Sequence, residues 1–471
     1  MAVCLPVRAA ASAAVLLALA LGAGAQAPEK LAALLPVVKE ADGLASQADA
    51  RIWSGFHFKE VPLVFFDGAT RQALVAHFQP LPEGFSPADP ALPGTGYGSL
   101  PAGTLAVQGS QPLGGRLAAW VDASAAAGAL TVRTLYREAF RVRLQYMGVP
   151  PPPPLPAAGY PSEDPENAAL LRAEAALAGR LAAAPRDQAA GLAATLAALR
   201  TRRQARLAPE VAAWENGREV NDGLAEYAAS AATGDRTPVA IGADAGAVRA
   251  ADPRHWASTG GAVALAADAA APGWKVSFEK SARTDLSAEL RRLADAAPAD
   301  LAALNLDALV TEEKKAAEAL AARRAELLTS IQQAKGIVVV LQLEGWLDPA
   351  KGISWTNRFD PKGVVPVDVD RKIHSYYKLV GAGVLEFTSS RPSLITVRRQ
   401  ITTGFSPEDL ALYQLTVDGN PTSLSVESPS ATGRVEVRAP QFELKVNYGR
   451  VEFDASSRHL VVTPLASPGA S

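Results

Sequence analysis

Alanine is distributed so unevenly along this chain that its two parts must fold differently. It makes up about a quarter of residues 1–350 but only 7 of the last 121. Because alanine is the strongest helix former and β-branched residues favour strands, the change predicts a helical body followed by a β-rich part. The apolar run from Ile337 to Leu343 marks the transition. We therefore expect an α+β chain with a mainly helical domain at 26–335 and a β-rich, sandwich-like domain at 336–471.

The first 25 residues have the pattern of a secretory signal peptide. Arg8 precedes an apolar run at 9–21, and Ala23-Gly24-Ala25 predicts cleavage after Ala25. The run is shorter than the ~20 residues that a spanning helix needs, so we expect no membrane span in the mature chain. We predict an exported protein of the periplasm, the cell envelope or the extracellular space.

Several function classes find no support in the composition. The formal net charge of −2 lacks the basic excess typical of nucleic-acid binders. The single cysteine, Cys4, precedes the apolar run, which excludes an internal disulfide framework and a Cys-based metal site. A Gly-x-Ser-x-Gly elbow and a phosphate-binding loop are also missing, which argues against serine hydrolases and P-loop enzymes.

Local patterns predict the elements in more detail. We expect a helix at about 30–50, a strand at Val61–Phe66 that begins a small N-terminal sheet, and a helix at about 123–147 that ends at Gly148. The prolines at 150–154 predict a stiff strut. Breaks between the later helices are predicted at Pro185, Pro209, Thr233-Gly234, Pro253, Pro272-Gly273 and Pro298. Predicted strands include 394–401, 412–417, 434–438, 442–448 and 451–453, with turns at Asp418-Gly419 and Tyr448-Gly449-Arg450.

Two stripes of opposite charge are the most informative pattern. Arg133, Arg137 and Arg141 recur every four residues on one predicted helix, with Glu138 beside them. Like charges at this spacing repel by a few tenths of a kcal/mol per pair, which favours negative groups opposite them. A second helix, from about Pro209 to Ala232, carries four carboxylates within an arc of about 60°: Glu215, Glu219, Asp222 and Glu226. The stripes either are two solvated faces or meet across a cleft as an ionic cluster.

At these residues the chain resembles the gluzincin class of zinc metallopeptidases, in exported bacterial members. That family carries an H-E-x-F-H-like motif on one helix and E-G-L-A-x-Y about eighty residues later. The corresponding segments here are Arg137-Glu138-Ala139-Phe140-Arg141 and Asp222-Gly223-Leu224-Ala225-Glu226-Tyr227. Shorter similarities at 61–68, 83–85, 259–262 and 268–275 extend the resemblance over roughly residues 50–290. It implies a metallopeptidase-like helical domain and zinc as the family cofactor.

The departures from the family pattern decide what the resemblance implies here. Glu138 matches the general base, while Arg137, Arg141 and Asp222 occupy the three metal-ligand positions. Arginine has no lone pair for a metal and stays protonated, so we expect zinc to be absent and Glu138 to be inactive. Loss of the dication would leave buried carboxylates unpaired, and guanidinium groups would restore the positive charge. Arg133, Glu219 and Glu226 complete the predicted cleft charge cluster.

Other metal sites remain open as alternatives. The five histidines are too far apart in sequence for a local pair; they are His57, His77, His255, His374 and His459. His57, His77 or His255 could approach the cleft, and a carboxylate site on Glu219, Asp222 and Glu226 could hold calcium or magnesium.

The leading functional prediction is a non-catalytic pseudo-peptidase whose cleft binds an extended peptide or an envelope protein. The strand at Val61–Phe66 would then offer an edge for such a peptide. An active secreted metallohydrolase with a rearranged metal site and a structural envelope protein are the alternatives.

Overall fold

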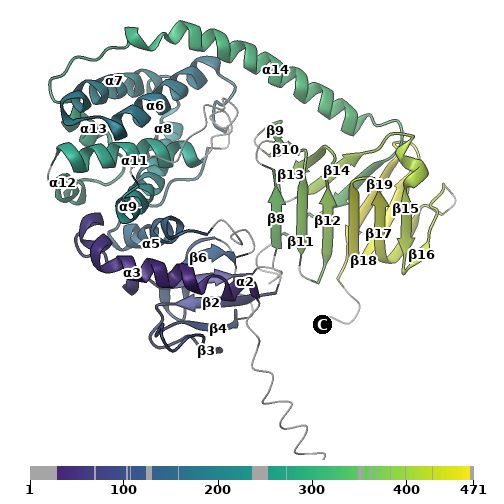
Figure 1. Ribbon diagram of the computed structural model, residues 1–471. Helices are drawn as coiled ribbons and strands as arrows, with labels where there is room; N and C mark the ends of the chain where they lie inside the picture. The colour runs from purple at the N-terminus through teal and green to yellow at the C-terminus, as the bar shows by residue number, and fades with distance from the viewer. Residues whose placement is uncertain are drawn as a thin grey trace, which may run out of the picture.

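The computed structural model describes residues 29–466 except 68–69, 102–103, 105, 107, 124–129, 157–158, 236–252, 272, 348–352, 354, 361–362, 369, 382, 398 and 427. The predicted signal peptide lies outside the described residues. The described chain combines helices and sheets, with a six-stranded sheet and a helical bundle in the first part and a curled β-sheet in the C-terminal part (Figure 1).

The N-terminal sheet has the strand order β3-β4-β2-β1-β6-β5. Its strands are β1 (Leu63–Phe66), β2 (Gln72–Ala76), β3 (Phe85–Pro87), β4 (Gly96–Ser99), β5 (Gly109–Leu113) and β6 (Arg116–Asp122). β1 pairs antiparallel with β2 and parallel with β6, so it is an inner strand. The prediction that this strand offers an edge to a peptide is therefore wrong. All four β1 residues are buried and apolar, which is typical of a strand that is covered on both faces.

The helices follow the predicted Pro and Gly breaks closely. They are α2 (Glu29–Ala32), α3 (Leu35–Ile52), α5 (Val132–Tyr146), α6 (Pro165–Ala183), α7 (Arg186–Gln204), α8 (Pro209–Arg218), α9 (Leu224–Thr233), α11 (Pro253–Ala270), α12 (Trp274–Lys280), α13 (Ser287–Ala294) and α14 (Leu306–Gln332). The α5 helix begins at Val132, where the Thr131 side chain accepts a hydrogen bond from the Thr134 amide, and most of the predicted first part of this helix, at 124–129, lies outside the described residues. It ends before Gly148, whose φ is 72°.

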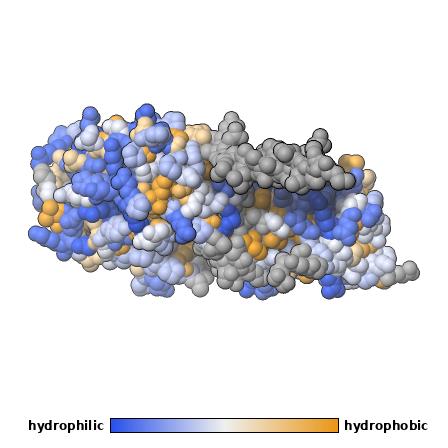
Figure 2. Space-filling model, turned by 90° about the horizontal axis from the view of Figure 1, so that it is seen from below, coloured by the Kyte–Doolittle hydropathy of each residue, from blue (hydrophilic) through white to orange (hydrophobic). Residues whose placement is uncertain are grey.

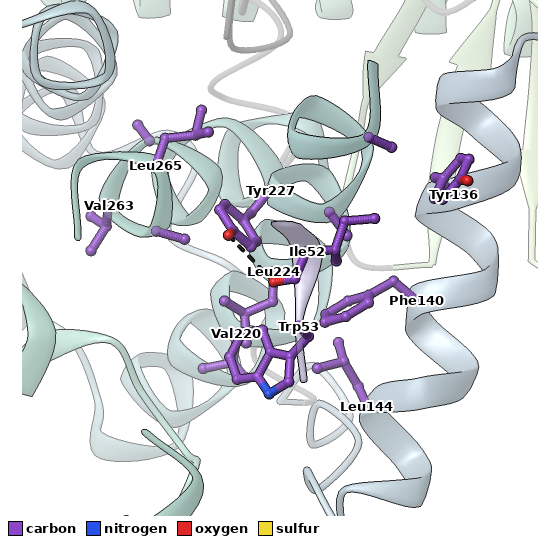
Figure 3. Packing of buried hydrophobic residues seen from close by; sticks show 14 of the residues in the cluster. Ile52, Trp53, Tyr136, Phe140, Leu144, Val220, Leu224, Tyr227, Val263 and Leu265 are labelled. Carbon is purple, nitrogen blue, oxygen red and sulfur yellow. Dashed lines mark hydrogen bonds between the residues drawn. The ribbon is translucent and has the colours of Figure 1, made fainter. Parts of the chain in front are cut away.

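A single apolar core holds α3, α5, α9 and α11 together. Trp53, at the end of α3, lies with its ring centroid 5.7 Å from that of Phe140 and 5.3 Å from that of Trp274. Figure 3 shows Phe140 on α5 directed toward Trp53 and the Tyr227 hydroxyl bonded to the Ile52 carbonyl oxygen. This core fixes α5 and α9 as neighbours.

The C-terminal part is a curled, 13-stranded sheet with its own core. Its strands are β7 (Val338–Gln342), β8 (Trp355–Phe359), β9 (Val364–Pro366), β10 (Arg371–His374), β11 (Tyr377–Gly381), β12 (Leu385–Ser389), β13 (Ser393–Thr396), β14 (Gln400–Gly404), β15 (Gln414–Val417), β16 (Asn420–Pro421), β17 (Ser430–Ala439), β18 (Phe442–Asp454) and β19 (His459–Pro464). The sheet curls because β18 pairs over its first half with β12 and over its second half with β19.

Two predicted features of this sheet are wrong. Residues 394–401 form the ends of two strands, β13 and β14, which pair with each other as a hairpin. The predicted turn at 448–450 lies inside β18, which runs on without a break because Gly449 pairs with Gly433 of β17. The turn at Asp418-Gly419 is confirmed, with both residues at positive φ between β15 and β16.

The long helix α14 connects the two parts (Figure 1). Near its start Glu313 pairs with Arg172 of α6 at 2.7 Å. Nearer its end Arg324 pairs with Glu163 at 2.5 Å and donates to the Val367 carbonyl oxygen. Within the described residues, no helix is long and apolar enough to cross a bilayer. The face seen in Figure 2 is mostly hydrophilic, with apolar residues in small separate patches.

Candidate functional site

Three arginines and two carboxylates form a chain of alternating charges between α5 and the segment that joins α8 to α9. Arg141 is its centre: Nη1 donates to Glu138 Oε2 at 2.9 Å, and Nη2 donates to Asp222 Oδ1 at 2.7 Å. At one end Arg137 Nε donates to Glu138 Oε1 at 3.2 Å. At the other end Arg218 Nη2 lies 2.8 Å from Asp222 Oδ2. We call these five residues the arginine chain. It has a positive charge at both ends and a net charge of +1.

The acids and the bases of the arginine chain differ sharply in exposure. The side chains of Glu138 and Asp222 are 1% and 5% exposed, whereas those of the three arginines are 27–30% exposed. The two carboxylates are therefore shielded from solvent more completely than the arginine side chains that bond them.

Arg141 neutralises both buried acids. Burial alone would lower the pKa of its guanidinium, but the adjacent charges of Glu138 and Asp222 outweigh that effect and raise the pKa. The guanidinium therefore stays charged, and its planar shape lets it bond both carboxylates at once.

The third arginine of the stripe belongs to a separate pair. Arg133 donates through Nε to Glu226 at 3.0 Å and through Nη2 to the Ser230 hydroxyl at 2.9 Å. A further contact at 3.3 Å joins it to the exposed Asp235. The structure thus brings Arg133, Arg137, Arg141, Asp222 and Glu226 to one helix interface, which corresponds to the second of the two arrangements left open for the stripes.

The other two residues of the acidic stripe face elsewhere. Glu215 pairs with Arg203 at 2.5 Å and Glu219 pairs with Arg200 at 2.5 Å, and both arginines lie on α7. The prediction that Glu219 joins the α5 cluster is therefore wrong. The cause is a π-helical turn at Glu219–Gly223, between α8 and α9. One extra residue in a turn rotates the following residues by about 100°, so that Asp222 and Glu226 face α5 while Glu215 faces α7.

The α7 side holds a buried charge network that the sequence analysis did not find. Arg203, only 1% exposed, donates to Glu174 at 2.7 Å as well as to Glu215. Burial would raise the pKa of Glu174, but Arg203 and Arg200 outweigh it and lower the pKa. The Tyr160 hydroxyl donates to Glu215 at 2.6 Å. The sequence signal that could have revealed this network is the presence of Arg200 and Arg203 in a helix made largely of alanine and leucine.

Glycines let α11 approach the π turn closely. A Cβ on Gly260 would lie 2.5 Å from the Glu219 carbonyl oxygen, and a Cβ on Gly223 would lie 2.5 Å from the Gly260 Cα. Both positions therefore exclude any side chain. This contact holds the π turn, and with it Asp222, in place.

The histidines do not assemble around the arginine chain. His77 bonds Asp42 at 2.9 Å and the Val61 carbonyl oxygen at 2.8 Å, while His255 is buried beside Trp256. His57 precedes the turn at 58–60, and His374 and His459 lie in the C-terminal sheet. Among the residues described, no group of three or more His, Cys, Asp or Glu side chains is arranged to hold a metal ion.

Comparison with family models, curated proteins and solved structures yields no match for this chain. The resemblance to gluzincins therefore stays a prediction.

Proposed function

We propose that this protein is an exported pseudo-peptidase, which binds an extended peptide or a partner at the arginine chain and does not cleave it. The observation that carries the proposal is the position of Arg141, which bonds both the residue that matches the family's base, Glu138, and the residue that matches its third ligand, Asp222.

The residues at the gluzincin ligand positions do not fit zinc. Neither arginine has a lone pair to donate, and both Glu138 and Asp222 already pair with guanidinium groups. Glu138 is 1% exposed and bonded on both oxygens, so it is poorly placed to take a proton from water. No hydrolytic step follows from this arrangement. Binding through the exposed N–H groups is what it supports.

The test uses the full mature chain and pools of synthetic heptapeptides with random uncharged residues. Immobilised wild-type protein is expected to retain peptides, which mass spectrometry recovers intact, and metal analysis is expected to find far less than one zinc per chain. The variant Arg137→Glu should retain several-fold less. Arg143→Glu is the matched control, because Arg143 lies on the same helix but contacts the Ser54 carbonyl oxygen.

Each alternative has its own outcome. Stoichiometric zinc with chelator-sensitive cleavage would overturn the proposal in favour of an active metallohydrolase. Equal retention by wild type and Arg137→Glu would favour a structural envelope protein without a binding site at this place.

A further inference from the structure

We infer that the ligand of the arginine chain carries an anionic group, a peptide carboxylate, that binds the terminal nitrogens of Arg137. This inference rests on the proposed binding function and names the chemistry that the site selects. It follows from three features of the arginine chain: its excess charge, its free donors and the layering of its exposed and buried groups.

The excess charge comes first. The arginine chain contains three guanidinium groups and two carboxylates. One of its positive charges is therefore not neutralised by a carboxylate of the chain itself. The neighbouring group of Arg133, Glu226 and Asp235 carries a net charge of −1, but both of its carboxylates contact Arg133, and Asp235, at 3.3 Å, is 55% exposed to screening by water. An excess charge at a partly buried site is stabilised by a counter-ion, and water does this less well there than in bulk solvent.

The free donors point to Arg137. Its only hydrogen bond within the described chain uses Nε, so Nη1 and Nη2 remain available with the side chain 30% exposed. The two terminal nitrogens form a planar fork whose geometry matches the two oxygens of a carboxylate. Arg133 is different, because all three of its guanidinium nitrogens already donate to neighbours.

The layering decides which ligand groups are favoured. Glu138 and Asp222 are almost completely buried while Arg137 is partly exposed, so an approaching anion meets the Arg137 donors before it meets like charge. A neutral carbonyl oxygen can accept the same hydrogen bonds but leaves the excess charge unbalanced. A lysine side chain or an amino terminus would be repelled. The site therefore selects for an acidic residue or a free C-terminus in the bound peptide.

The experiment compares two pools of acetylated heptapeptide amides, with random uncharged residues around a fixed central Glu or Gln. Wild-type protein is expected to retain the Glu pool about 5- to 10-fold better than the Gln pool, in line with one charge-assisted, partly exposed contact. In Arg137→Gln the ratio should fall to about 1. Arg137→Lys, which keeps the charge and loses the fork, should give an intermediate ratio, and Arg143→Gln should behave as wild type.

The outcomes separate this inference from the proposed function. If wild type retains both pools equally, the protein binds peptides but the preference for an anion is refuted. If it retains neither pool, the proposed function fails and the inference fails with it. A Glu preference that survives unchanged in Arg137→Gln would also overturn the inference, because another residue would then read the carboxylate. Thermal unfolding of each variant shows that the fold is intact.

Discussion

Replacing Arg141 by methionine tests whether this guanidinium is what allows two carboxylates to be buried. The substitution keeps the length of the side chain and removes three charge-assisted hydrogen bonds, two to Glu138 and one to Asp222. Breaking a buried ion pair by removing one partner costs about 3–5 kcal/mol. Because the Arg141 side chain is 28% exposed and each acid keeps one other arginine, we expect the lower end, about 3 kcal/mol.

Urea unfolding of the full chain, followed by tryptophan fluorescence and fitted with a transition for each part, measures this cost. Trp53 packs against Phe140 of α5 and reports on the helical part. The control Arg143→Met, which loses one bond at 3.3 Å, should cost less than about 1 kcal/mol. Adding Glu138→Gln and Asp222→Asn to Arg141→Met should recover most of the loss. The reasoning is refuted if Arg141→Met costs under about 1 kcal/mol, or if the triple variant is no more stable than the single one.

Three further predictions concern stability away from Arg141. Gly260→Ala should destabilise the helical part by about 1–3 kcal/mol in the same urea titration, because the new Cβ would meet the Glu219 backbone. Its control is Gly43→Ala on α3, where the Cβ would meet open space, and this change should stabilise the helical part by about 0.5–1 kcal/mol. Arg203→Met should cost about 4 kcal/mol, because Arg203 balances two buried acids. Its neighbour Arg202 pairs with the partly exposed Glu166, so Arg202→Met should cost under about 0.5 kcal/mol. Burial, with a smaller contribution from Lys372, lowers the pKa of His374 from 6.5 to about 4. Its contribution to stability is therefore complete above pH ~6.5 and is lost as the pH falls toward 4, so His374→Phe should reduce the acid destabilisation of the β-rich part between pH 7 and 5 by about 1–2 kcal/mol.

The elements that sequence reasoning predicted well are those that local chemistry determines. The breaks at Pro209 and at Thr233-Gly234 bound the helix that carries the acidic stripe, because proline and left-handed glycine act within one turn. The change in alanine content located the start of the curled sheet for a similar reason, since propensity sums over many residues. The stripe on α5 was readable because every fourth residue of an α-helix shares one face.

The errors share a different cause, which is pairing between distant residues. Gly449 looks like a turn until it is seen opposite Gly433, and the position of β1 within its sheet depends on β6, more than fifty residues later. The π turn at Glu219–Gly223 is invisible to a calculation that assumes 3.6 residues per turn. It packs against Gly260 of α11, whose missing side chain allows this close approach. That one turn separated the acidic stripe into two sets of partners.

Two charge networks involve residues of α8, the π turn and α9, one around Arg203 and one around Arg141, and only the second is suited to binding a ligand. Around Arg203 both the acids and the base are buried, so a ligand would have to displace a fully desolvated ion pair. Around Arg141 the acids are buried and the bases are partly exposed, so a ligand gains hydrogen bonds without breaking any. Shape alone does not choose among ligands at such a surface, because any carbonyl oxygen can reach the free donors of Arg137. The excess positive charge of the arginine chain does discriminate, because an anion neutralises it and a neutral carbonyl oxygen does not. The specificity of the site therefore comes from its charge and not from the shape of a pocket.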